Sequence, residues 1–382
     1  MNILLAPIER QSMTTSEATL QVRVDDGFAE WMSHFSGSLA ITTYQAGKIV
    51  LVGWDGRQVT ILPRTFDKPM GLAVAPLQAG RPLRFALATR HEVVQFANAP
   101  LLAPDFQPTQ RGRYDSLFLP RTSHFSGDLN VHDLAYAEDG LWVVNTRFCC
   151  LAKLSDEFNF IPEWKPPFVT AIVPEDRCHL NGLCVVDGKP KYVTCLGETD
   201  VAGGWRSGKA SGGVVLDVST NEVVTRGLAM PHSPRWHANQ LWVLNSGAGE
   251  LCAVDPKDGR RVVVATLPGY LRGLRLVGNW AMVGLCKIRE THIFGGLPVQ
   301  QSSGKLLCGV AIIDLASGRQ AGLLQFTAGC EELFDMQILP NIRRPMILNR
   351  EREEARQAFA APDFAYWLRP ENLILDSSEQ SV

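Results

Sequence analysis

The feature that most constrains the fold is a set of apolar strand patterns that recurs along most of the chain. Strand-opening segments occur near residues 71, 133, 180, 233, 272 and 334. Each is followed by short runs rich in Val, Leu and Trp, separated by Gly, Asn and Asp, as is typical of antiparallel strands joined by tight turns. The openings are about 40 to 60 residues apart, which is close to the period of four-stranded propeller blades.

The two ends of the repeat predict how the ring closes. The last opening strand, LFDMQILP from Leu333, has no following strands, whereas the strands between Leu39 and Leu62 have no opening strand. Pairing the C-terminal strand with the N-terminal strands completes both and leaves only short sheet edges. We therefore predict an all-β, six-bladed β-propeller closed by pairing of the N- and C-terminal strands. A β-sandwich or several small β domains would leave both ends unpaired.

The repeats occupy the middle of the chain and define the expected domain organisation. Residues 37–350 are predicted to form a single propeller domain. Residues 1–36 are polar and irregular, and they are predicted to be a flexible lead-in with one short helix at Asp26–His34. Residues 351–382 are predicted to form a C-terminal helix, up to about Ala361, and a tail.

Composition excludes several classes of partner. Hydrophobic residues make up 46% of the chain and charged residues 20%, and the net charge is −2. Nucleic acids and anionic membranes are poor candidates as main partners, because binding to them depends on basic surface. No stretch approaches the ~20 apolar residues of a membrane span, and the N-terminal segment lacks the basic start of a secretory signal. Nine cysteines without a C-x-x-C pair indicate reduced thiols in a cytoplasmic protein.

Polar residues and long loops are expected on one face of the propeller. The first strand of each blade lines the central channel, and the loops between second and third strands return to the face where those first strands begin. The insertions 100–131, 198–211 and 291–307 are assigned to this top face. Because loops longer than a turn needs commonly cover binding sites, we expect a pocket there.

Three histidines occupy matching positions in consecutive blades. His132, His179 and His232 each open a channel strand, so their side chains are expected to converge near the axis. Three imidazoles can bind Zn, Mn, Fe or Cu and leave a position open for water or substrate. Asp335 and Gln337, on the last channel strand, are predicted to complete or support this metal site. The alternative is that the histidines bond to nearby carboxylates or bind substrate without a metal. The nearby carboxylates are those of Asp128, Asp133, Glu175 and Asp176.

The other candidate residues are placed around the same opening. Arginine and lysine side chains suit a carboxylate or phosphate on a ligand, although salt bridges to neighbouring glutamates explain them equally well. Trp205 lies in an insertion, which favours stacking on a ligand. The catalytic candidates are Asp133, Arg235, Arg272 and Glu198, and the substrate-binding candidates are Arg147, Asn181, Asn245, Lys287 and Trp205. The absence of G-x-G-x-x-G, P-loop and G-x-S-x-G motifs gives no support for a nucleotide cofactor or a serine nucleophile.

Several segments resemble a bacterial family of uncharacterised proteins. They are PRTSHFSGDLNVHDLAY, LWVVNTRF, PEDRCHLNGL, MPHSPRWH, LWVLNSGAGEL, GLCKIRE and FGGLP. The resemblance covers about residues 35–345, and it implies a propeller-like domain of unknown function. More loosely, the blade pattern is similar to NHL-repeat and gluconolactonase-type six-bladed propellers. The latter bind calcium through Glu, Asn and Asp, where this sequence has histidines, so the resemblance implies a fold and no activity.

Together these observations predict an enzyme with a pocket at the top of the channel. It would be a metal-assisted hydrolase, lyase or oxygenase that acts on an anionic substrate. The alternative is a non-catalytic propeller that binds a peptide, a modified protein or a small metabolite on the same face. A metal-free acid–base enzyme that uses the same histidines lies between the two.

Overall fold

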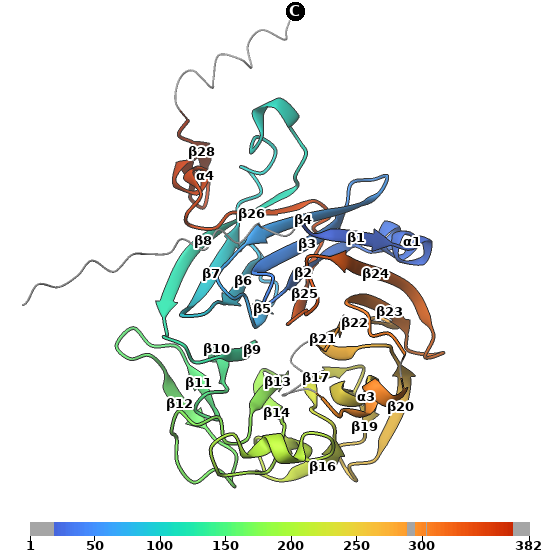
Figure 1. Ribbon diagram of the computed structural model, residues 1–382. Coiled ribbons are helices and arrows are strands. Elements are labelled where there is room, and N and C mark those ends of the chain that lie inside the picture. The colour runs from blue at the N-terminus through green and yellow to red at the C-terminus, as the bar shows by residue number, and fades with distance from the viewer. Residues whose placement is uncertain (1–18, 289–294, 303, 370–382) are drawn as a thin grey trace, which may run out of the picture.

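Six antiparallel sheets surround a central channel in the computed structural model, which describes residues 19–288, 295–302 and 304–369 (Figure 1). The sheets are consecutive along the chain, and the innermost strands of neighbouring sheets contact each other around the whole ring. The predicted six-bladed β-propeller is therefore confirmed.

The blades are named one to six in chain order, with each blade's innermost strand given first. Blade one contains β25 (Met336–Pro340), β2 (Gly37–Thr42), β3 (Lys48–Trp54) and β4 (Val59–Thr65). Blade two contains β5 (Leu72–Val74), β6 (Arg84–Ala88), β7 (Glu92–Asn98) and β8 (Ser116–Phe125). Blade three contains β9 (Val131–Ala137), β10 (Gly140–Asn145), β11 (Cys150–Lys153) and β12 (Ile161–Trp164).

The second half of the ring repeats this order. Blade four contains β13 (Leu180–Val186), β14 (Lys189–Cys195), β15 (Gly213–Asp217) and β16 (Val223–Leu228). Blade five contains β17 (His232–His237), β18 (Gln240–Asn245), β19 (Glu250–Val254) and β20 (Arg261–Thr266). Blade six contains β21 (Tyr270–Val277), β22 (Trp280–Cys286), β23 (Gly309–Asp314) and β24 (Gln320–Ala328).

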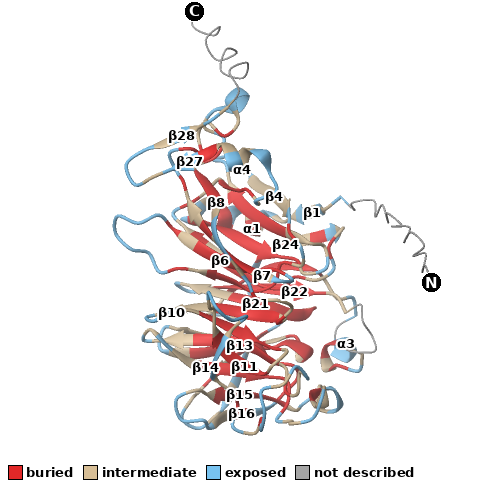
Figure 2. Cartoon of the chain, turned by 90° about the vertical axis from the view of Figure 1, so that its left-hand side faces the viewer, coloured by how far each residue is buried: buried red, intermediate tan, exposed pale blue. Residues whose placement is uncertain are grey.

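The hydrophobic core consists of layers between adjacent blades. Between blades one and two, for example, Ile49 and Leu51 pack against Leu72, Phe85 and Phe118. Because each blade is covered on both faces, its middle strands are apolar at nearly every position instead of alternating, and β2 is buried along its full length. Figure 2 shows this edge-on, with buried strands inside and exposed residues at the loops and tips.

The ring closes by the predicted pairing of the two ends of the chain. β25 pairs antiparallel with β2, with Leu39 opposite Ile338 and Gly37 opposite Pro340. A second pairing adds β1 (Gln21–Val24) to β24 as a fifth strand of blade six. Both ends of the chain therefore stabilise the closed ring.

The predicted lead-in is partly built into the propeller. Helix α1 has the predicted bounds, Asp26–His34, and the Asp25 side chain caps it by accepting a hydrogen bond from the Phe28 amide at 2.7 Å. Phe28 and Met32 on this helix are fully buried in the core that includes blade six. Residues 21–34 therefore belong to the fold, although they precede the expected boundary at residue 37. Residues 1–18 lie outside the described residues.

The C-terminal segment extends blade two. β26 (Pro345–Ile347) pairs in parallel with β8. It is followed by α4 (Glu353–Gln357) and a small hairpin of β27 (Ala358–Ala360) and β28 (Ala365–Trp367), which projects from the ring (Figure 1). The helix is shorter than predicted because the chain turns into β27 after Gln357. The expected tail from residue 370 lies outside the described residues.

In the described part of the chain, three short 3₁₀ helices and one further α-helix lie in the connections. They are η1 (Pro108–Gln110), η2 (Gly204–Gly208), η3 (Ser246–Ala248) and α3 (Pro298–Ser302). Among the described residues, no helix is long and apolar enough to span a membrane.

Candidate functional site

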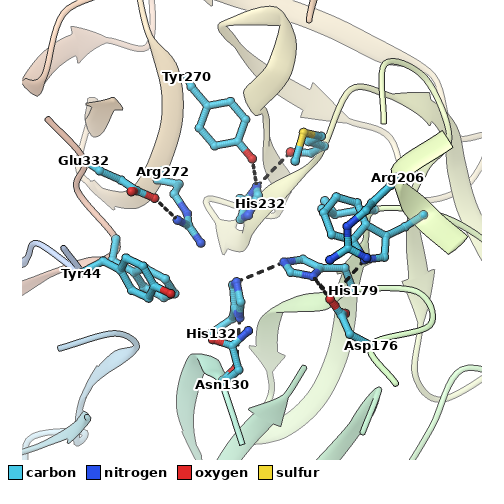
Figure 3. Close-up of a pocket in the computed structure, with 14 residues that line it drawn as sticks. Tyr44, Asn130, His132, Asp176, His179, Arg206, His232, Tyr270, Arg272 and Glu332 are labelled. Carbon is cyan, nitrogen blue, oxygen red and sulfur yellow. Dashed lines mark hydrogen bonds and ion pairs between the residues drawn. The ribbon is translucent and has the colours of Figure 1, made fainter. Parts of the chain in front are cut away.

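A cavity of about 200 Å³ opens at the end of the channel where β9, β13, β17 and β21 begin (Figure 3). Blades three to six supply most of its wall, and the segment before β25 and the loop between β2 and β3 of blade one supply the rest. The lining residues are Tyr44, Asn130, His132, Asp176, His179, Leu196, Trp205, Arg206, Met230, His232, Tyr270, Arg272, Glu332 and Phe334. We call this cavity the upper pocket.

His132 is held in one tautomer. Its Nδ1 lies 3.0 Å from the carbonyl oxygen of Asn130 and 2.8 Å from the hydroxyl oxygen of Thr146, and that hydroxyl donates to the carbonyl of Leu180. A carbonyl oxygen only accepts, so the proton of the neutral ring is on Nδ1. The other nitrogen, Nε2, is left with its lone pair.

His232 repeats this arrangement two blades away. Its Nδ1 lies 2.9 Å from the carbonyl oxygen of Met230 and 3.2 Å from the hydroxyl of Ser246. The Tyr270 hydroxyl is 3.4 Å from the same nitrogen. Nε2 of His232 is therefore also unprotonated in the neutral ring.

His179 lies between them and has a carboxylate partner instead. Its Nδ1 is 2.9 Å from Asp176, which also accepts a hydrogen bond from the Trp205 indole at 3.2 Å. Its Nε2 is 3.2 Å from Nε2 of His132. Because two lone pairs repel at this distance, the contact requires a proton shared between the rings or an electrophile bound to both nitrogens.

Burial and nearby positive charge favour the neutral form of two of the rings. Burial lowers the pKa of His132 well below its usual value, and His179 and Arg272 lower it further. Burial and the Arg272 guanidinium likewise lower the pKa of His232. At neutral pH both rings are uncharged, so each can accept a proton or bind a cation.

Arg272 supplies a buried positive charge to the pocket wall. The residue is 6% exposed, and its guanidinium lies 4.0 Å above the ring centre of Phe334. Its Nη1 donates to Glu332 at 2.8 Å. The Nε–H is buried, and the described part of the chain offers it no hydrogen-bond partner.

Strained backbone surrounds the pocket. Asn130, Asp176, His179 and Met230 have φ values of 54°, 47°, 51° and 49°, and all four line the cavity. Left-handed conformations are unfavourable for residues other than glycine, and they persist where surrounding structure enforces them, often at functional sites. In blades three and five, the strained residue is the one whose carbonyl holds the histidine.

A layer of ion pairs lies below the histidines. Asp133 accepts from Arg235 at 2.9 Å and from the amide of Leu183, in the next blade, at 3.1 Å. Asp335 accepts from the amide of Leu72 at 3.0 Å, and burial raises its pKa to about 6. These carboxylates tie the inner strands of neighbouring blades together. A small space of about 10 Å³ separates this layer from the upper pocket.

The predicted metal set is divided between the two layers. The three histidines line the upper pocket, whereas Asp335 lies in the ion-pair layer and Gln337 donates to the carbonyl of Leu72. Within the described residues, no group of three or more His, Cys, Asp or Glu side chains is arranged to hold a metal ion.

Most of the other predicted residues lie outside the upper pocket. Arg272 and Trp205 line it, but Trp205 packs against His179 and Arg206 and leaves no free face for stacking. The others are bonded elsewhere because a nearer partner is available. Asp133, Arg235 and Asn181 lie in the lower layer, and Arg147, Glu198, Asn245 and Lys287 bond to Asp128, Arg226, Glu250 and Glu331 respectively.

Sequence reasoning missed Tyr270 and Phe334. Tyr270 begins β21 as His232 begins β17, so its register was a usable signal. In the sequence, Phe334 has the pattern of an ordinary core residue. Its role in the pocket is seen only in the structure, where its ring contacts the Arg272 guanidinium. Of the insertions, 198–211 contributes Trp205 and Arg206, and 100–131 contributes only Asn130 among the lining residues. Residues 291–294 and 303 of the third insertion lie outside the described residues.

Comparison with known proteins places the chain in a family. No curated protein matches the sequence. A chain of a nidogen–laminin complex is 10% identical, with a TM-score of 0.47, over 80% of this chain and 98% of that one. A protein of unknown function from Bacteroides caccae is 11% identical, with a TM-score of 0.48, over 79% of this chain and 98% of that one. The sequence profile of DUF4915, a domain of unknown function, matches residues 26–348, and the chain therefore belongs to this family.

Proposed function

We propose that the protein is an enzyme that carries out proton transfer on a small anionic substrate in the upper pocket. The observation that carries this proposal is the 3.2 Å contact between Nε2 of His132 and Nε2 of His179. Acceptors hold the Nδ1 atoms of both rings, so the two Nε2 atoms face each other with at most one proton between them. Such a pair can take a proton from a substrate and return it.

The two rings are suited to different roles. His132 is buried and its pKa is lowered, so it acts as the base. Asp176 accepts a hydrogen bond from Nδ1 of His179 at 2.9 Å and orients that ring toward His132, as carboxylates do for catalytic histidines. His179 is assigned as the partner that carries the shared proton.

The rest of the pocket fits a small anion. Arg272 provides a positive charge at low exposure, where solvent screens it little. The cavity of about 200 Å³ is below the 300–1,000 Å³ typical of sites for drug-sized ligands. A small metabolite is the expected substrate.

A divalent metal bound by the same histidines is the second candidate. Two nitrogens that bind one metal at about 2.1 Å lie about 3.0 to 3.4 Å apart, for angles between about 90° and tetrahedral at the metal. The 3.2 Å separation falls in this range, and His232 lines the same cavity. Zn, Mn, Fe or Cu held there would polarise a substrate oxygen.

The location and partners follow from the chain as a whole. All nine cysteines are buried and free, which fits a reducing compartment such as the cytoplasm. The net charge of −2 favours a small molecule over nucleic acid or membrane as partner.

The test combines turnover with metal analysis. Protein purified without a His-tag is incubated in D₂O with a panel of small carboxylates and phosphate monoesters, and turnover or deuterium incorporation is followed by NMR. We expect His132→Asn and His179→Asn to lower the rate at least ~100-fold, and His91→Asn, at an exposed histidine outside the pocket, to leave it unchanged.

The other outcomes separate the candidates. Near-stoichiometric metal that is lost in both pocket variants would support the metal-assisted enzyme. Binding without any turnover would instead identify a non-catalytic binding protein. Turnover that survives both substitutions would exclude the histidine pair from the chemistry.

A further inference from the structure

Among the described residues, one complete edge of the Arg272 guanidinium has no hydrogen-bond partner. Its bond from Nη1 to Glu332, at 2.8 Å, is the one hydrogen bond that the described structure gives this side chain. The opposite edge, formed by Nε and Nη2, makes no hydrogen bond to the described residues, and its Nε–H group is buried. A buried donor without a partner is unfavourable, so this edge is expected to have a ligand.

The guanidinium is fixed in place before any ligand arrives. Phe334 covers one face at 4.0 Å, and Glu332 holds one end. Figure 3 shows the group directed into the space between His132 and His232. A planar group with two acceptor oxygens matches a free guanidinium edge in bidentate geometry.

We propose that the upper pocket binds a small hydroxycarboxylate, with its carboxylate on the Nε–Nη2 edge of Arg272 and its hydroxyl donating to a histidine. This proposal rests on the proposed function and names its substrate class. Nε2 of His132 already faces Nε2 of His179 at 3.2 Å, whereas Nε2 of His232 is unprotonated in the neutral ring and accepts a hydrogen bond from a ligand. A ligand that matches this pocket therefore carries one anionic group for Arg272 and one neutral donor for His232.

The same contacts disfavour related ligands. A phosphate dianion would bring two negative charges into a cavity that also contains the carboxylates of Asp176 and Glu332. An amino acid would bring an ammonium group beside the buried Arg272 cation. A carboxylate without a hydroxyl would leave Nε2 of His232 without a donor.

Binding is measured directly on the wild-type protein. The Arg272 Nε–H resonance, assigned by its loss in Arg272→Lys, is followed by ¹⁵N NMR during addition of glycolate, acetate, glycine or inorganic phosphate. We expect glycolate to shift this resonance and to bind at least tenfold more tightly than the other three. A resonance that none of the four moves would overturn the proposal, as would tighter binding of phosphate or glycine.

Matched variants test the residue assignment. Arg272→Lys keeps the positive charge but removes the two-nitrogen edge, and it should weaken glycolate binding at least tenfold. Arg57→Lys, at an exposed arginine outside the upper pocket, should leave binding within twofold. A loss of binding in Arg206→Lys with none in Arg272→Lys would move the anion site to Arg206.

These readouts are independent of turnover. Glycolate binding at Arg272 without any reaction upholds the ligand class and refutes the enzyme. Histidine-dependent turnover with an unresponsive Arg272 upholds the enzyme and refutes the ligand class.

Discussion

His132 and His232 make the same hydrogen bonds in blades three and five. In each, Nδ1 contacts the carbonyl oxygen two residues earlier and the hydroxyl oxygen fourteen residues later, Asn130 and Thr146 for one and Met230 and Ser246 for the other. Equivalent positions in the two blades therefore have the same hydrogen-bond pattern at the histidine Nδ1. Both rings are oriented before any ligand binds.

The first prediction concerns the tautomers of these rings. In ¹⁵N-labelled protein at pH 7, both histidines should give the pattern of a neutral ring protonated on Nδ1, because backbone carbonyls hold that proton. Thr146→Val should leave the tautomer of His132 unchanged but increase the mobility of its ring. A proton on Nε2 of either ring would contradict the geometry.

The second prediction concerns stability at acid pH. The pKa values of His132 and His232 are lowered in the folded state, so below about pH 6.5 the unfolded chain binds more protons at these sites. The free energy of unfolding should then fall as pH falls, by about 1.4 kcal/mol per pH unit for each ring. Urea unfolding between pH 5 and 8, in wild type and in His132→Asn/His232→Asn, measures this difference.

Comparison with the variant isolates the histidines from Asp335. The pKa of Asp335 is raised to about 6, so its contribution is present below about pH 4 and is lost as pH rises through 6. Asp335 is present in both the wild type and the double variant. Its contribution to the free energy of unfolding therefore cancels when the two pH curves are subtracted. Parallel curves for the two proteins would show that the histidines titrate normally.

The third prediction concerns the ion pair in the lower layer. Asp133→Asn should lower the free energy of unfolding by about 3–5 kcal/mol, because it leaves the Arg235 cation, with a side chain 11% exposed, without its closest carboxylate. Asp133→Asn/Arg235→Met should recover part of this loss, since the uncompensated Arg235 cation is gone, while Asp335 loses its 3.8 Å contact with that cation. Denaturant unfolding of the two single variants and the double variant measures the coupling free energy between Asp133 and Arg235. If the losses in the two single variants simply added up in the double variant, the two residues would not be coupled.

The fourth prediction concerns the close approach of two strands beside Arg272. A Cβ atom on Gly284 would lie 1.9 Å from the Arg272 carbonyl oxygen. Gly284→Ala should therefore destabilise the fold by about 1–3 kcal/mol or more, and should weaken ligand binding at Arg272.

Gly208→Ala provides the matched control, because a Cβ there meets no atom within 4 Å. Thermal unfolding and glycolate titration of both variants test the prediction. Equal stability of the two variants would mean that β21 and β22 can separate at little cost.

The sequence predicted the ring and the three histidines because both depend on a repeating register. His132, His179 and His232 stand at equivalent openings, and all three line one cavity. Depth within the channel was harder to judge. A strand rises about 3.3 Å per residue, so Arg235 lies well below His232 although both belong to β17. The same shift takes Asp335 below the pocket.

Side chains in loops were the least predictable. Glu198, Asn245 and Lys287 were assigned to the top face from their positions, but loop residues follow no period that fixes their direction. Each bonds to a partner on another strand or loop, at Arg226, Glu250 and Glu331. The salt-bridge alternative anticipated Glu331 as a partner for the cations, and Lys287 pairs with it. No sequence pattern indicates Arg226 as the partner of Glu198 or Glu250 as the partner of Asn245, so the folded chain is needed to identify them.

The pairing of β25 with β2 sets the order in which the molecule becomes complete. During synthesis, β2, β3 and β4 emerge long before β25, so their sheet has an open inner edge until residues 336–340 arrive. Glu332 and Phe334, which fix Arg272, directly precede β25. The docking of β25 therefore closes the inner ring and completes the ligand site in one step, so a chain interrupted before β25 would have neither a closed ring nor a complete pocket.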